Sequence, residues 1–177
     1  MRLPLLLSCL AVAATACSDE VEWFPDDLDR QQMISVAGEA AAAQACDAFE
    51  AYLIDQYRAS MLTDIACAVI AIDASEDEAA CKAAVKACKA EPPTSVDALI
   101  TSLVDAASCG GLDYQPTSCS QTLGALADCL DATEVELRAL KARLPCTLAG
   151  TPLPADTLTL ATPAACETIE TACPTPN

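Results

Sequence analysis

Alanine, leucine and isoleucine recur at helical spacing between residues 26 and 91, where the chain has no proline and only one glycine, Gly38. Apolar residues that return every three or four positions form one face of a helix. The pattern predicts a first helix from about residue 27 to about residue 57. A second helix is predicted over residues 61–72, and it is either separate from the first helix or a continuation of it. The buried stripe of the first helix is predicted to be Ile34, Ala37, Ala41, Ala45 and Ala48.

A third helix is predicted over residues 76–90. Ser75 and Glu78 match a capping box, in which the two side chains satisfy free backbone N–H groups at a helix start. The pair Pro92-Pro93 closes this part of the chain, since proline cannot continue a helix.

A fourth helix follows these prolines, with Thr94 or Ser95 as its cap, and reaches about residue 108. The pair Gly110-Gly111 marks its end. Its predicted buried face consists of Val96, Leu99, Ile100, Leu103 and Val104.

The last third of the chain predicts a long helix, a loop and a short helix. The long helix covers residues 121–144 and stops at Pro145. Residues 145–163 are rich in proline and threonine and predict a loop, in which residues 157–161 are also compatible with a short strand. A final helix is predicted over residues 164–172. The leucines on the buried face of the long helix are Leu123, Leu126, Leu130, Leu137 and Leu140.

The chain begins with an apolar segment, residues 1–16, which carries one basic residue, Arg2, and ends in small residues before Cys17. This join, Ala-Thr-Ala-Cys, resembles the signal of a bacterial lipoprotein. The resemblance implies removal of residues 1–16 and attachment of a palmitate-type diacylglyceryl group to Cys17. By the same analogy, Ser18 directs the protein to the outer membrane. Beyond the signal, the chain is similar in style to uncharacterised cysteine-rich helical lipoproteins, a likeness that implies no activity.

The cysteine count favours this interpretation. The chain has twelve cysteines; Cys9 lies in the signal, and ten remain if Cys17 carries lipid. Ten is an even number, so five disulfides leave no free thiol in an exported protein. Ordinary secretory cleavage at the same join would instead give a secreted protein with an unpaired cysteine. The expected structural disulfide residues are Cys46, Cys67, Cys81, Cys88, Cys109, Cys119, Cys129, Cys146, Cys166 and Cys173.

Cys67 and Cys81 lie at equal distances from the predicted turn near Ala74, so we expect them to join an antiparallel helical hairpin. Cys88 would then reach Cys46. For the six remaining cysteines, fifteen pairings stay open. No C-x-x-C pair and no histidine occur, which argues against a zinc or redox site.

Cys81 and Cys88 are seven residues apart, as are Cys166 and Cys173. Seven helical residues return to nearly the same face. Each pair is therefore expected to bond a neighbouring element twice rather than to bond internally.

These features predict an all-α fold: a disulfide-stapled bundle of about five to six helices with a long Pro/Thr-rich loop before the last helix. Residues 17–26 form a tether, and residues 27–177 form one domain with halves 27–91 and 94–177. Trp23-Phe24 in the tether either pack back onto the domain or lie at the membrane interface.

The formal net charge is −17 and becomes −18 when Arg2 leaves with the signal. Such a surface repels nucleic acid and anionic lipid, so the expected membrane contact is through the lipid anchor alone. After the signal, no apolar run reaches transmembrane length. An envelope protein is the expected kind of partner.

No catalytic site, metal site or cofactor site is predicted. Histidine is absent, and the four lysines are Lys82, Lys86, Lys89 and Lys141, three of them at solvent-face spacing on one helix. The carboxylates of Asp73, Glu76, Asp77 and Glu78 are interpreted as a solvated helix start.

We therefore expect no enzyme but a lipid-anchored protein of the bacterial cell envelope that acts as a structural or protein-interaction module. The alternative is a binder of small apolar ligands in a disulfide-braced helical cavity. A cavity lined by Leu, Ile and Val would favour that alternative, and a core closed by alanines and cystines would count against it.

Overall fold

The computed structural model describes residues 23–112, 114–154 and 156–173. The described residues are helical or irregular and include no named strand, which confirms the all-α prediction. The helices are α1 (Ile34–Ala37), α2 (Glu39–Tyr57), α3 (Thr63–Ala74), α4 (Glu78–Ala90), α5 (Thr94–Ala107), α6 (Leu123–Ala142) and α7 (Ala164–Ala172).

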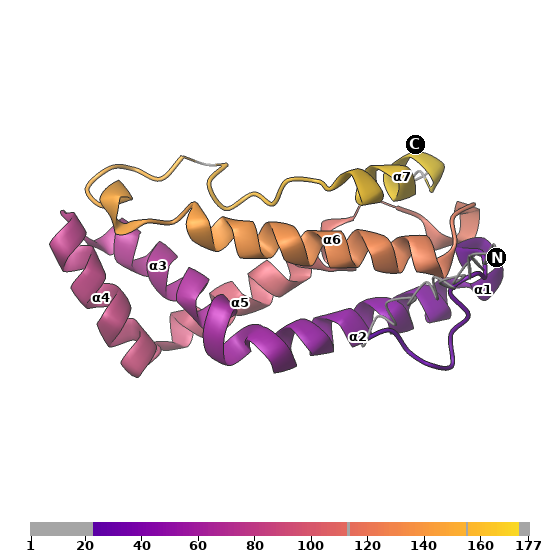
Figure 1. The fold of residues 1–177 in the computed structure, drawn as a ribbon, viewed down its shortest axis with the longest axis horizontal. Helices are drawn as coiled ribbons and strands as arrows, with labels where there is room; N and C mark the ends of the chain where they lie inside the picture. Colours follow the sequence, from indigo (N-terminus) through magenta and orange to yellow (C-terminus); the bar gives the residue numbers. More distant parts are fainter. Residues whose placement is uncertain (1–22, 113, 155, 174–177) are drawn as a thin grey trace, which may run out of the picture.

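Helices α2 and α6 run along the length of the molecule (Figure 1). Helix α7 packs along one end of α6, while the α3–α4 hairpin forms the opposite end of the molecule. The loop after α6 returns along the outer side of that helix to reach α7. One core cluster joins all these helices, so the described residues form a single packed unit.

The first predicted helix begins later than expected and is interrupted. Residues 26–33 form turns, and Gly38, with φ of 88°, separates α1 from α2. Glycine adopts this left-handed backbone at little steric cost, so the helix breaks there. The backbone N–H of Ile34 donates to Gln121 at 2.8 Å, and that of Leu123 donates to Gln32 at 2.9 Å. These bonds tie the start of the domain to the start of α6.

The second predicted helix is a continuation of the first, through one turn of π-helix at Arg58–Leu62. The hydroxyl of Thr63 donates to the carbonyl of Arg58 at 2.5 Å within this turn. A π turn carries an extra residue, which rotates the following side chains relative to those before it. Met61, Leu62 and Ile65 are thereby buried as the chain bends from α2 into α3.

The capping box was predicted at the wrong residue. Asp77, not Ser75, is the N-cap of α4, and its carboxylate accepts from the N–H of Ala80 at 2.8 Å. Asp77 has extended backbone angles, which places its short side chain under the free N–H groups of the first turn. The predicted cap of α5 is also wrong, because Pro93 holds that position and makes no side-chain bond.

The long loop before α7 is present, with a 3₁₀ turn at Cys146–Leu148. Residues 157–161 form turns and irregular backbone rather than a strand. The helix predicted over residues 164–172 is confirmed as α7.

Five disulfides cross-link the described residues, and they use all ten cysteines predicted to be structural. The pairs are Cys46–Cys109, Cys67–Cys88, Cys81–Cys146, Cys119–Cys173 and Cys129–Cys166.

The predicted pair Cys67–Cys81 is wrong, because Cys67 bonds Cys88. The turn between α3 and α4 covers residues 75–77, so the midpoint of the hairpin lies later than Ala74. This shift places Cys88, rather than Cys81, beside Cys67. The expected Cys46–Cys88 pair fails for the same reason, and Cys46 bonds Cys109 instead.

The expectation for cysteines seven residues apart holds for one pair. Cys166 and Cys173 both bond the segment that leads into and forms α6, through Cys129 and Cys119. The pair Cys81 and Cys88 does not meet this expectation. Cys81 bonds Cys146 in the loop after α6, whereas Cys88 bonds Cys67 in α3. Cys46–Cys109 and Cys81–Cys146 each connect the two halves suggested by the sequence.

Candidate functional site

The described part of the tether is fixed onto the domain at Trp23. Its ring packs edge-on against Phe49 of α2, with centroids 4.8 Å apart, and its indole N–H donates to Asp131 of α6 at 2.7 Å. Burial raises the pKa of Asp131, although the indole hydrogen bond acts in the opposite direction. Of the two interpretations of Trp23-Phe24, packing onto the domain is the one observed, since each residue is only 9% exposed.

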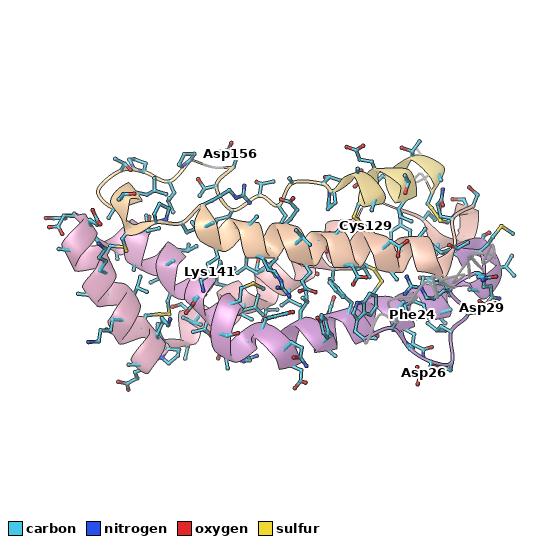
Figure 2. The ribbon with its side chains drawn as sticks, viewed as in Figure 1. Phe24, Asp26, Asp29, Cys129, Lys141 and Asp156 are labelled. Atoms are coloured by element: carbon cyan, nitrogen blue, oxygen red, sulfur yellow. A yellow bond between two sulfur atoms is a disulfide. The ribbon has the colours of Figure 1, made fainter. Side chains whose placement is uncertain are left out.

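Phe24 is held next to Trp23, and Figure 2 shows it close to α2. The two rings meet edge to face with centroids 5.7 Å apart. The guanidinium of Arg30 lies over the Phe24 ring at 5.4 Å and also pairs with Asp128 of α6 at 2.8 Å. The start of the domain is thus joined to both long helices by aromatic and charged contacts.

A polar network crosses between the end of α2 and the middle of α6. The hydroxyl of Tyr57 donates to Glu134 at 2.8 Å and lies 3.2 Å from the hydroxyl of Tyr52. Arg138 binds Glu134 and donates to the Tyr57 hydroxyl at 2.6 Å. The bond to Tyr57 and burial together raise the pKa of Tyr52, and the bond to Glu134 raises that of Arg138. Each member has a partner, so the network braces the two helices.

Glu134 was missed as a site residue, although the sequence carries a signal for it. The leucines on the buried face of α6 are interrupted between Leu130 and Leu137. Thr133 and Glu134 occupy the buried positions in this gap. Both are buried, and Thr133 donates to the carbonyl of Ala107 in α5 at 2.5 Å. A polar residue at a core position of an apolar stripe needs a partner across the bundle.

Asp64 of α3 connects three helices. Its two carboxylate oxygens bind Lys89 of α4 at 2.5 Å and Lys141 of α6 at 2.6 Å. Figure 2 shows Lys141 between α6 and α3. Burial alone would raise the pKa of Asp64, but Lys141 and Lys89 outweigh it and hold the pKa below its usual value. Lys89 is therefore a helix brace rather than a free cation.

The other singled-out charges lie on the surface around the start of α4. Asp77 is the cap described above, and Glu78 pairs with Lys82 at 2.6 Å along the helix. Asp73 and Glu76 are exposed. These positions agree with the interpretation of the acidic run as a solvated helix start.

A groove of about 430 Å³ runs between α2 and α5. Its floor includes Ile100 and Val104, and its lining also includes Glu50, Ile54, Arg58, Ala98, Thr101, Ser102 and Asp105. A second, more open hollow lies beside Trp23 and shares Ile54 with the groove. Both are surface features that are open to solvent.

Among the described hollows, the α2–α5 groove has the volume of a ligand site and a lining that includes Ile and Val, but it is open to solvent and is not an enclosed cavity. The most enclosed of them has a volume of about 40 Å³, and its lining includes the polar residues Ser108, Thr133 and Glu170. Small-molecule sites usually have volumes of several hundred Å³, so this space suits water. The core of the described residues contains cystines and the buried alanines Ala42, Ala45, Ala66, Ala71, Ala107 and Ala127.

Cys17 lies outside the described residues. Among residues 23–112, 114–154 and 156–173, no helix is long and apolar enough to cross a bilayer. In the same ranges, no cluster of Cys, Asp or Glu side chains is arranged to hold a metal ion.

Comparisons with protein-family models, with curated proteins and with solved structures find no match to this chain.

Proposed function

We propose that the protein is anchored in the bacterial cell envelope by a lipid on Cys17, and that its helical domain is a non-enzymatic structural or protein-interaction module. The observation that carries this proposal is the join at Cys17, where an apolar segment with one basic residue ends in Ala-Thr-Ala-Cys. The lipobox-like residues set both the cleavage point and the lipid attachment site.

The disulfide arrangement supports the proposal. Ten cysteines of the domain are paired in five bonds, so Cys17 has no partner left among them. An exported protein with a free N-terminal thiol would be prone to oxidation and cross-linking. A thioether-linked lipid on Cys17 removes that thiol. With Cys9 lost in the signal, the mature protein would then have no unpaired cysteine.

The position of Trp23 gives the anchor a structural consequence. Six Cα steps separate Cys17 from Trp23, so even a fully extended chain spans only about 20 Å. Trp23 is fixed to Phe49 of α2 and Asp131 of α6, so a lipid on Cys17 would lie within that distance of Trp23. The acidic surface repels anionic headgroups, so the lipid and not the protein face supplies the attachment. Ser18 favours the outer membrane as the destination.

The bonding of the polar clusters supports a non-enzymatic role. Asp64 binds lysines of two other helices, and Asp131 accepts from the indole N–H of the tether. Glu134 accepts from the hydroxyl of Tyr57 at the end of α2. These bonds use the side chains to hold helices together. They leave the exposed faces as the surface through which the domain meets other molecules.

An intact mass of the membrane-extracted protein, before and after reduction and alkylation, tests the proposal. We expect a diacylated or triacylated mass beginning at Cys17, with ten alkylatable thiols that appear only after reduction. Cys17→Ser should abolish the lipid mass and release the protein from membranes. Cys9→Ser is the matched control, because Leu6-Leu7-Ser8-Cys9 looks similar, and it should keep the lipid. An unlipidated wild-type mass would refute the anchor.

A further inference from the structure

The groove between α2 and α5 combines an apolar floor with an exposed apolar rim. Ile100 and Val104 on α5 are 2% and 3% exposed and belong to the core, whereas Ile54 on α2 is 38% exposed. Ile54 also lines the hollow beside Trp23, so it stands between two concave surfaces. A branched aliphatic side chain in this position offers apolar area to whatever fills the groove.

Carboxylates outnumber cations around the groove. Glu50 and Asp105 line it, and Asp55 lines the neighbouring hollow. The cation in the lining, Arg58, is already paired with Asp97 of α5 at 2.6 Å. The remaining charge of the groove is therefore negative, and it adds to a protein whose formal net charge is already −17. Charge complementarity then requires a cationic occupant.

We propose that this groove docks a cationic segment of a partner protein, with an aliphatic side chain against Ile54 and lysine or arginine side chains next to Glu50 and Asp105. This inference rests on the proposed role as an interaction module and names the surface and the chemistry of the partner. A purely apolar occupant would leave the two carboxylates desolvated without compensation. A purely basic occupant would leave the Ile54 side chain and the apolar floor without a contact.

The probe is a fluorescent synthetic peptide of alternating lysine and leucine, titrated onto the lipidated full chain in phosphatidylcholine nanodiscs. Empty nanodiscs provide the background. Ile54→Lys should weaken binding by about tenfold, because it removes the apolar contact and adds a repelling charge. Val135→Lys on α6 is the matched control, since Val135 is 63% exposed and outside the groove, and it should change the dissociation constant by less than about twofold.

The charge part is tested separately. Asp105→Asn should weaken binding by about threefold, while Glu167→Gln, the same charge change at an exposed position on α7, should have little effect. Peptides of alternating glutamate and leucine, or of lysine and serine, should bind much less tightly. Thermal melting monitored by circular dichroism confirms that each variant is folded.

Equal weakening by Ile54→Lys and Val135→Lys would overturn the proposal, because binding would then follow total charge and not the groove. Equal binding of the lysine–serine peptide would overturn it as well. The anchor is judged independently by intact mass. Lipidated protein that binds no peptide refutes the groove alone, whereas an unlipidated chain that binds the peptide at Ile54 refutes the anchor alone.

Discussion

Helices α6 and α4 are held in the molecule in different ways. Ten of the twenty residues of α6 are buried, and they include five leucines that face the core. Of the thirteen residues of α4, Cys81 is the one that is buried. Helix α6 is therefore fixed by apolar burial, and α4 lies against the molecule with most of its surface exposed.

Covalent and ionic bonds, rather than a buried apolar face, hold α4 against its neighbours. Cys88 bonds Cys67 in α3, Cys81 bonds Cys146 beyond α6, and Lys89 binds Asp64. The backbone N–H of Gly150, in the loop that follows Cys146, donates to the carbonyl of Ser75 at 2.9 Å. Both ends of α4 are thus linked to neighbouring elements.

The comparison shows how an alanine-rich chain compensates for small side chains. Apolar burial stabilises by about 25 cal/mol for each Å², and alanine contributes little area. A disulfide instead lowers the entropy of the unfolded chain and stabilises a helix whatever its side-chain volume. Two of the five cross-links hold α4, the helix with the thinnest buried face.

Removing the Cys81–Cys146 bond should have the largest effect. The bond spans 65 residues, and the loop-entropy relation predicts a loss of about 4 kcal/mol in the free energy of unfolding for Cys81→Ser/Cys146→Ser. Cys67→Ser/Cys88→Ser, which opens a loop of 21 residues, should cost about 3 kcal/mol. Chemical denaturation measures both. Losses below 1 kcal/mol in both variants would show that α4 is held by other contacts.

Truncation of one side chain in each helix should have the next largest effect, and the loss of stability should differ between α6 and α4. Leu137→Ala in α6 should lower the free energy of unfolding by about 3 kcal/mol, since Leu137 is fully buried. Val85→Ala in α4 is the control, and it should cost less than about 1 kcal/mol because Val85 is only partly buried. Similar losses at the two positions would remove the distinction between them.

Asp64→Asn tests the ionic contribution to α4 and should cost about 1 kcal/mol at pH 7. The pKa of Asp64 is lowered in the folded protein, so its contribution is present above the unfolded value of 3.8. That contribution is lost as the pH falls through the lower, folded pKa. Wild type should therefore lose stability between pH 4 and pH 2 more steeply than Asp64→Asn does. Identical slopes would exclude the ion pairs as a source of stability.

The smallest expected effect concerns the start of α4. Asp77→Ala should cost about 1 kcal/mol or slightly less, because it removes the bond to the Ala80 N–H. Ser75→Ala should change stability by less than about 0.5 kcal/mol, since Ser75 is not the cap. Thermal melts of the two variants measure the difference. A larger effect at Ser75 would restore the capping box that the sequence indicated.

The helical fold could be predicted from the sequence because its stripes and stop signals are local. Leu123, Leu126 and Leu130 mark the face of α6, and Pro145 marks its end. The disulfide pairing depends on where turns place residues that are far apart, and an α3–α4 turn that lies later than Ala74 exchanged Cys81 for Cys88. The Asp64 and Glu134 networks escaped prediction because one partner of each, Lys141 and Tyr57 respectively, lies 77 residues away in the chain.

The pairing around α4 is the most direct test of this account. Proteolysis of the unreduced protein followed by mass spectrometry identifies which cysteine peptides are linked. The account predicts one linked species that contains Cys67 and Cys88 and another that contains Cys81 and Cys146. A species that links Cys67 directly to Cys81 would contradict it, because neither the Cys67–Cys88 bond nor the Cys81–Cys146 bond could then be present in the same molecule.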